Sequence, residues 1–144
     1  MTHKKKIIIY ADGGSRGNPG PSGAGSVVMN EKGKLLAEVS EFLGHTTNNV
    51  AEYTAILEGL KAAKKKVGVK VLADMPVEIR MDSELVVRQL QGRYKVKHPN
   101  LKPLFAEVSA LISKYFPHIT YTHVPREKNK IADALANLAM DTGA

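Results

Sequence analysis

The sequence predicts one α/β domain built on a mixed sheet of five strands with helices on both faces. Short β-branched runs alternate with longer segments whose apolar residues recur at helical spacing. Their order is β-β-β-α-β-α-α-β-α, so the sheet is antiparallel first and parallel later. A length of 144 residues and a 43% hydrophobic share fit a single core, and we expect one domain over residues 1–144.

Three strands are expected at the start of the chain. Residues 7–11 form an apolar, β-branched run that is typical of a strand buried on both faces. Residues 24–29 and 35–42 flank a polar turn at 30–33 that ends in glycine, which predicts a hairpin. Residues 13–25 hold six of the twelve glycines and two prolines, which predicts a shaped loop.

The remaining chain alternates helices and strands. From Asn49, apolar residues lie on one helical stripe, and four lysines follow where cations suit the helix dipole, so a long amphipathic helix is expected. The later elements are predicted as a strand at 77–81, helices at 83–91 and 101–115, a strand at 119–123 and a helix at 130–140.

Composition excludes several kinds of chemistry. The chain has no cysteine, so it has no disulfide, thiolate metal site or cysteine nucleophile, and any metal is held by oxygen or imidazole ligands. The charged start runs into an apolar stretch too short for a signal peptide or membrane span, so we expect a soluble, cytoplasmic protein with no membrane partner. We also expect a monomer. The net charge of +7 attracts polyanions but does not by itself establish one as a partner.

Four acidic residues lie at the ends of the predicted elements. Asp12 and Asp82 close strands, and Glu52 and Asp133 lie in the first turns of helices. Open α/β sheets place their sites at such ends. Clustered carboxylates repel one another unless a hard cation neutralises them, which favours Mg²⁺, with Mn²⁺ as a substitute.

Each acid also has a purely structural interpretation. Asn49 and Glu52 have the spacing of a helix cap with its capping-box acid. Asp82 suits an N-cap, Asp12 suits a turn before two glycines, and Asp133 suits an exposed helix position. Each structural interpretation stays open for its own residue, but the joint occurrence of four acids at converging element ends favours a functional site.

Four sequence blocks resemble the ribonuclease H type 1 family. Residues 10–25 resemble its first-strand signature and residues 46–52 its helix-entry motif, and residues 81–83 and 129–136 resemble its third and fourth blocks. The blocks occur in the family's order and span nearly the whole chain. The resemblance implies the ribonuclease H fold.

The resemblance also implies an activity, which is cleavage of the RNA strand of RNA–DNA hybrids to leave 5′-phosphate and 3′-hydroxyl ends. Two metal ions are expected, with Asp12 bridging both, Glu52 and Asp82 supporting one, and Asp133 holding the second. Such a mechanism needs no covalent nucleophile.

Substrate contacts carry over from the family in the same way. Minor-groove contacts to 2′-hydroxyls distinguish RNA from DNA without recognising sequence. For Asn48 and Asn49 a helix cap is the alternative role. The expected substrate-contacting residues are Gly13, Gly14, Ser15, Arg16, Gly17, Asn18, Asn48, Asn49 and Glu84.

The chain departs from many family members in two places. Only residues 92–100 separate two helices where those members have a basic protrusion, so the chain resembles compact archaeal and bacterial forms, some of which also accept double-stranded RNA. Arg93, Lys95 and Lys97 in this segment either bind the DNA-strand backbone or form a solvated connection. The loop at 124–128 lacks the proton-shuttle histidine of other members; Arg126 is expected to neutralise the product, and His123 to be packed or hydrogen-bonded.

Two other functions remain as alternatives. An integrase-like polynucleotidyl transferase uses the same fold and acids, although the paired asparagines and the glycine-rich segment disfavour it. A catalytically silent nucleic-acid-binding module is the second, and it needs a defect in the site that the four acids do not suggest.

Overall fold

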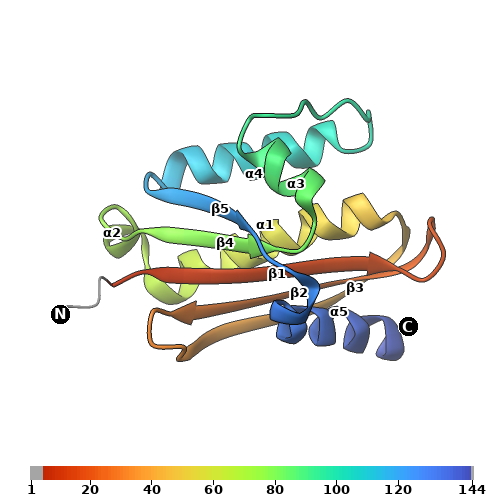
Figure 1. The fold of residues 1–144 in the computed structure, drawn as a ribbon, viewed down its shortest axis with the longest axis horizontal. Helices are drawn as coiled ribbons and strands as arrows, with labels where there is room; N and C mark the ends of the chain where they lie inside the picture. Colours follow the sequence, from red (N-terminus) through yellow and green to blue (C-terminus); the bar gives the residue numbers. More distant parts are fainter. Residues whose placement is uncertain (1–4, 144) are drawn as a thin grey trace.

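The computed structural model describes residues 5–143 and contains one five-stranded sheet in the order β3-β2-β1-β4-β5 (Figure 1). Residues 1–4, part of the charged start discussed above, lie outside the described residues. The strands are β1 (Ile7–Ser15), β2 (Gly20–Asn30), β3 (Leu35–Thr46), β4 (Val77–Met81) and β5 (Ile119–His123). The helices are α1 (Asn48–Val67), α2 (Val69–Leu72), α3 (Glu84–Leu90), α4 (Lys102–Tyr115), the short 3-10 helix η1 (Arg126–Lys128) and α5 (Lys130–Thr142).

The pairing of the strands confirms the predicted mixed sheet. β2 is antiparallel to both β1 and β3, whereas β4 is parallel to both β1 and β5. β1 therefore lies at the centre, where the antiparallel and parallel halves meet.

Helices cover both faces of the sheet, as expected. The Ser26 hydroxyl donates to the carbonyl of Ala55 in α1, whereas the preceding residue, Gly25, faces Ala132 in α5. Successive residues of a strand point to opposite faces, so α1 and α5 lie on opposite sides. Figure 1 shows α5 beside β2 and β3, and α4 on the opposite side of the molecule, where it packs against α1.

The main core lies between the sheet and α1, where large apolar side chains are fully buried. Burial of such side chains is the dominant favourable contribution to folding. Its largest members include Ile9, Val28, Ile56, Leu60 and Ile79. No helix within residues 5–143 is both long enough and apolar enough to cross a bilayer.

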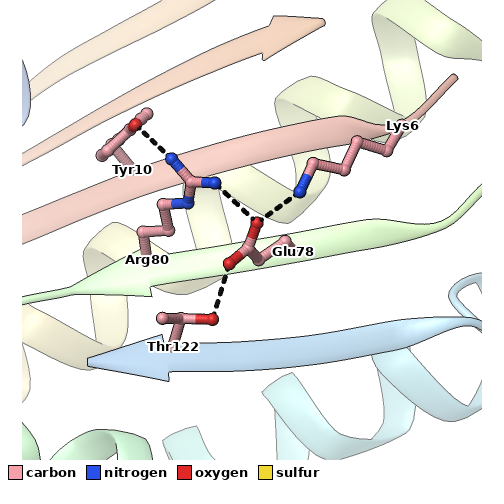
Figure 2. A network of polar contacts seen from close by, with 5 residues as sticks. All are labelled: Lys6, Tyr10, Glu78, Arg80 and Thr122. Carbon is pink, nitrogen blue, oxygen red and sulfur yellow. Dashed lines mark hydrogen bonds and ion pairs between the residues drawn. The ribbon is translucent and has the colours of Figure 1, made fainter. Parts of the chain in front are cut away.

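A polar network links β1, β4 and β5 on the face that α1 does not cover (Figure 2). Glu78 accepts hydrogen bonds from Lys6 at 2.9 Å, from Arg80 at 2.9 Å and from Thr122 at 2.6 Å. Arg80 also donates to the hydroxyl of Tyr10 at 2.7 Å. The three strands that lead towards the carboxylates are thus cross-linked by side chains as well as by their backbones.

One predicted segment is wrong. The expected loop at 13–25 is mostly strand, because β1 continues to Ser15 and β2 begins at Gly20, leaving only residues 16–19 as the turn. The two short helices, α2 and η1, were not predicted either. The hairpin turn is confirmed: Gly33 has a φ of 79°, and its N–H donates to the carbonyl of Asn30 at 3.0 Å.

Candidate active site

The register of the parallel strands brings Asp12 and Asp82 together. The β1–β4 pairing ends with Tyr10 opposite Arg80, and each aspartate follows its strand's last paired residue by two positions. Both therefore point to the same face at the same level of the sheet. Asp12 does not close β1 as predicted, because the strand continues along β2 with Asp12 opposite Gly25.

Two glycines allow both helices to reach Asp12. A Cβ on Gly13 would lie 2.2 Å from the backbone carbon of Ala51 and 2.4 Å from the backbone nitrogen of Glu52, both in α1. A Cβ on Gly25 would lie 2.2 Å from the carbonyl oxygen of Ala132 in α5, the residue before Asp133. The absence of side chains at these two positions therefore lets α1 and α5 bring their acids beside the strand.

The helix caps rule out two of the structural interpretations. Thr47 is the N-cap of α1 and accepts from the N–H of Val50, so Glu52 lies in the second turn and not in a first-turn capping box. Ser83 is the N-cap of α3, which leaves Asp82 free of that role. Asp133 does lie in the first turn of α5, as predicted.

All four carboxylates line one open pocket of about 380 Å³. It lies where β1 meets the starts of α1, α3 and α5. Its polar and charged lining comprises Asp12, Ser15, Arg16, Asn48, Glu52, Asp82, Ser83, Arg126, Asp133 and Asn137. Gly13, Gly14, Ala136 and Met140 complete it.

Burial and mutual repulsion raise the pKa of two of these acids. The pKa of Asp12 is raised to about 8, mainly by burial, and in part by a hydrogen bond shared with Asp133 and by the charges of Asp82, Asp133 and Glu52. The pKa of Glu52 is raised to about 7, mainly by burial and in part by the charge of Asp82, against a hydrogen bond from Ser83 that lowers it. The protein alone thus stabilises the charged forms of these groups poorly.

The donor set fits a hard divalent cation. The four acids of the pocket offer carboxylate oxygens. A bound cation would lower the raised pKa values of Asp12 and Glu52 again, because it favours the charged forms. Within residues 5–143, no three His, Asp or Glu side chains are gathered tightly enough to coordinate one ion together. Mg²⁺ does not need that, because it usually binds one or two carboxylates and completes its shell with water and substrate phosphate oxygens.

Asn129 connects three of the acidic positions, and it was not among the predicted site residues. It is only 1% exposed, and its amide donates to the carbonyl of Ala11 at 3.0 Å and to Oδ1 of Asp82 at 3.1 Å. Its backbone carbonyl accepts from the N–H of Asp133 at 3.1 Å. The sequence signal that was available is its position just before the helix that carries Asp133.

Asn48 of the helix-entry motif is anchored to the end of β1 and to the turn that follows it. Oδ1 of Asn48 accepts from the N–H of Ser15 at 2.8 Å, and the N–H of Asn48 donates to Oδ1 of Asn18 at 3.1 Å. Neither Asn48 nor Asn49 is the helix cap, since Thr47 has that role. Asn18 and Asn49 line a second hollow beside the first, together with Thr47, Val50, His98, Asn100 and Leu101.

The structure does not bring every predicted residue to the pocket. Arg16 lines it but pairs with Asp141 of α5, and Gly17 lies in the exposed turn. Glu84 lies on the surface of α3, where it pairs with Arg88 at 2.6 Å. His123 was expected to be packed or hydrogen-bonded; packing is wrong, because its side chain is exposed at the end of β5.

The three basic residues between α3 and α4 also lie outside the pocket. Arg93, Lys95 and Lys97 are all exposed, in a segment that spans only residues 91–101. The compact form without a protrusion is therefore confirmed. Contact between these residues and nucleic acid stays a prediction.

Comparison with known proteins identifies the family. A family model described as "Reverse transcriptase-like" matches residues 10–139. The structure superimposes with a TM-score of 0.90 on LC11-RNase H1, isolated from compost and solved in complex with an RNA/DNA hybrid; it is 54% identical over 94% of this chain and 97% of that one. The chain belongs to the ribonuclease H type 1 family.

Two further relatives agree with this assignment. RNase H1 from the archaeon Halobacterium salinarum is 40% identical, with a TM-score of 0.85 over 94% of this chain and 98% of the solved one. A bifunctional protein from Mycobacterium tuberculosis is 49% identical over 96% of this chain. This ribonuclease H domain spans only 36% of that protein's length and 65% of the full Halobacterium protein.

Proposed function

We propose that this protein is an endonuclease that hydrolyses the RNA strand of RNA–DNA hybrids with two divalent cations, Mg²⁺ or Mn²⁺, leaving 5′-phosphate and 3′-hydroxyl ends. The observation that carries the proposal is the convergence of Asp12, Glu52, Asp82 and Asp133 on one pocket beside the anchored asparagines. The hybrid bound by LC11-RNase H1, which is 54% identical, supports the choice of substrate.

The carboxylates would supply the ligands for this chemistry. Bound there, two divalent cations would supply Lewis-acid chemistry to the scissile phosphate, the attacking water and the leaving oxygen. Asp12 is central, because its pKa responds to all three other acids. Glu52 approaches from α1 and Asp133 from α5, so the pocket offers ligands on both sides of Asp12.

Recognition of RNA follows from the way the asparagine amides are held. Oδ1 of Asn48 and Oδ1 of Asn18 already accept backbone hydrogen bonds, which turns the NH₂ group of each side chain towards other partners. An NH₂ group donates well to the oxygen of a ribose 2′-hydroxyl. We infer that these residues and Asn49 distinguish ribose from deoxyribose without recognising base sequence.

Double-stranded RNA is a second candidate substrate. It presents the same 2′-hydroxyls in an A-form minor groove, and the short 91–101 segment adds no large structure that would select the DNA strand of a hybrid. Arg126 lines the pocket and would neutralise charge on the product.

The proposal is tested by incubating the protein with end-labelled hybrid, double-stranded RNA and duplex DNA in Mg²⁺, in Mn²⁺ and in chelator. We expect cleavage of the hybrid, little or none of duplex DNA, and none in chelator. Cleavage of DNA as readily as hybrid would favour a transferase or a general nuclease, and binding without cleavage in either metal would favour a silent module.

A second measurement tests the asparagine assignment. Replacing single ribonucleotides near the cut by deoxyribonucleotides should cost about 0.5–1.5 kcal/mol for each 2′-hydroxyl contact that is lost. This cost should shrink in Asn48→Ala, which lacks the partner. If the cost is equal in both proteins, another residue makes the contact.

A further inference from the structure

A second concave surface lies at the opposite end of the sheet from the carboxylates. This far-end groove has a volume of about 590 Å³ and lies between the start of β1, the β2–β3 turn and the end of α1. Its floor is aliphatic and consists of Ile7, Leu36, Val67 and Met75. Figure 1 shows the start of β1, the β2–β3 turn and α2 at the left end of the molecule.

The rim of the far-end groove is strongly basic. Lys5, Lys32 and Lys66 line it with one acid, Glu31. Within residues 5–143, none of these three lysines takes part in an ion pair. The surrounding elements add three more exposed lysines, which are Lys34, Lys65 and Lys70.

Cations around an aliphatic floor select for a ligand that is both acidic and apolar. We propose that the far-end groove binds an acidic peptide segment of a partner protein, with an aliphatic or aromatic side chain on the floor and carboxylates against the lysines. Its volume is within the usual range for pockets that bind ligands, about 300–1,000 Å³. Free lysines on the rim would steer such a peptide and increase its rate of association.

The lining favours a peptide over a second nucleic-acid site. Phosphate groups gain from the lysines but gain nothing from Ile7, Leu36, Val67 and Met75. Single-stranded bases bind by stacking on aromatic rings, and no Phe, Tyr or Trp among residues 5–143 lines this groove. Carboxylates attached to an apolar side chain match both parts of the surface.

The position of the groove makes it independent of catalysis. Ile7 lines the groove, and Asp12 lies five residues along the same strand, which corresponds to about 17 Å at about 3.3 Å per residue. A peptide bound there leaves the carboxylates open, so a partner could bring the protein to its substrate without blocking the pocket.

The test uses a fluorescent peptide with four aspartates around a central leucine, titrated with the 144-residue protein and followed by anisotropy. We expect saturable binding that weakens about fivefold to tenfold in Lys32→Glu and in Lys66→Glu, because each reversal places like charges together. Lys114→Glu on α4 is the matched control, since it makes the same charge change outside the groove. Circular dichroism confirms folding, and hybrid cleavage should be unchanged in both groove variants.

Two further probes separate the possible occupants. A peptide with serine in place of leucine should bind much more weakly, and amide shifts in ¹⁵N spectra should map to Leu36 and Val67. If the serine peptide binds as tightly as the leucine peptide, the proposal is wrong. It is also wrong if Lys114→Glu weakens binding as much as the groove variants do, because the protein then attracts acidic peptides in general. A different result would point to a nucleic-acid site and overturn the peptide proposal. In that case a single-stranded oligodeoxynucleotide would displace the peptide, and Lys66→Glu would lose affinity for the oligonucleotide.

Discussion

The side-chain amide of Asn129 donates to Oδ1 of Asp82 at 3.1 Å, and this bond ties the last helix to the end of β4. The same amide holds the carbonyl of Ala11, the residue before Asp12, and the backbone carbonyl of Asn129 accepts from the N–H of Asp133. One buried side chain therefore ties Asp82 to the backbone beside Asp12, at the residue whose backbone begins the helix that carries Asp133.

Replacing Asn129 by Ala should lower the turnover number more than it raises KM for hybrid. The loss of two buried hydrogen bonds should also cost about 1–3 kcal/mol of the free energy of unfolding. A displacement of about 1 Å in a catalytic group can cost about 100-fold in rate. Single-turnover kinetics measure the loss of rate, and urea unfolding measures the loss of stability. Calorimetry without substrate should show that Asn129→Ala binds Mn²⁺ more weakly than the native protein.

Asn137→Ala is the matched control for this prediction. Asn137 lies in the same helix and pocket, and its amide donates only to the carbonyl of Asp133. It should retain most of the turnover. If folded Asn129→Ala turns over hybrid at the rate of the native protein, Asn129 has no positioning role.

Gly25→Ala should displace α5 and with it Asp133. The new methyl group would meet the carbonyl oxygen of Ala132 at 2.2 Å, and backbone cannot move aside as a flexible side chain does. We expect a loss of about 1–3 kcal/mol in stability, as in other overpacked sites, together with a large loss of cleavage. Gly14→Ala is the control for stability, because its methyl group would meet Met140 at an ordinary contact distance of 3.8 Å; equal losses of stability in the two variants would contradict the proposed role of Gly25.

The sequence was sufficient to predict the mixed sheet and to place Asp12 and Asp82 at strand ends. Parallel strands end at the same edge of a sheet, so the two acids were expected side by side on the condition that the strands at 7–11 and 77–81 are neighbours. The structure supplies that condition, because β1 pairs with β4. The four family-like blocks then identified all the acids that line the pocket.

The glycine-rich segment was mispredicted because its glycines serve tertiary packing. Glycine density is typical of loops, but Gly13 and Gly25 lie in strands where α1 and α5 approach the backbone. Asn129 was missed for a similar reason. Its partner Ala11 is 118 residues away in the chain, and no local pattern reveals that contact.

The Glu78 network in Figure 2 should make the fold sensitive to acid. Hydrogen bonds from Arg80, Thr122 and Lys6 lower the pKa of Glu78 to about 2 from its ordinary 4.5, despite opposing burial. The stabilisation is therefore complete above about pH 4.5 and is lost as the pH falls towards 2. Glu78→Gln should lose about 1–3 kcal/mol at neutral pH and lose less further stability on acidification.

Thermal unfolding between pH 2 and 7 measures this difference. Glu127→Gln, in the exposed η1 helix, is the control and should follow the native curve. Parallel curves for Glu78→Gln and the native protein would show that the network contributes nothing to acid stability.

Replacing Lys95 and Lys97 by Ala should weaken hybrid binding without changing turnover at saturating substrate. Each phosphate contact that is removed should reduce the slope of log affinity against log salt by about 1. Both side chains are exposed and lie outside the carboxylate pocket, so the chemistry itself should be unaffected. An unchanged slope would show that the segment between α3 and α4 is a solvated connection.

The most direct test of the proposed mechanism is the cleavage rate of Asp12→Asn compared with Glu84→Gln. The amide at position 12 keeps the size of the carboxylate but removes its charge, and the pKa of that carboxyl group is raised by all three other acids. Glu84, by contrast, lies on the surface and pairs with Arg88. We predict that Asp12→Asn still binds hybrid but does not cleave it in Mg²⁺ or Mn²⁺, and that it unfolds at a higher temperature than the native protein in chelator, because one member of a repelling cluster is neutral. Glu84→Gln should cleave at close to the native rate. Native-like cleavage by folded Asp12→Asn would contradict the assignment of these carboxylates to metal-dependent hydrolysis.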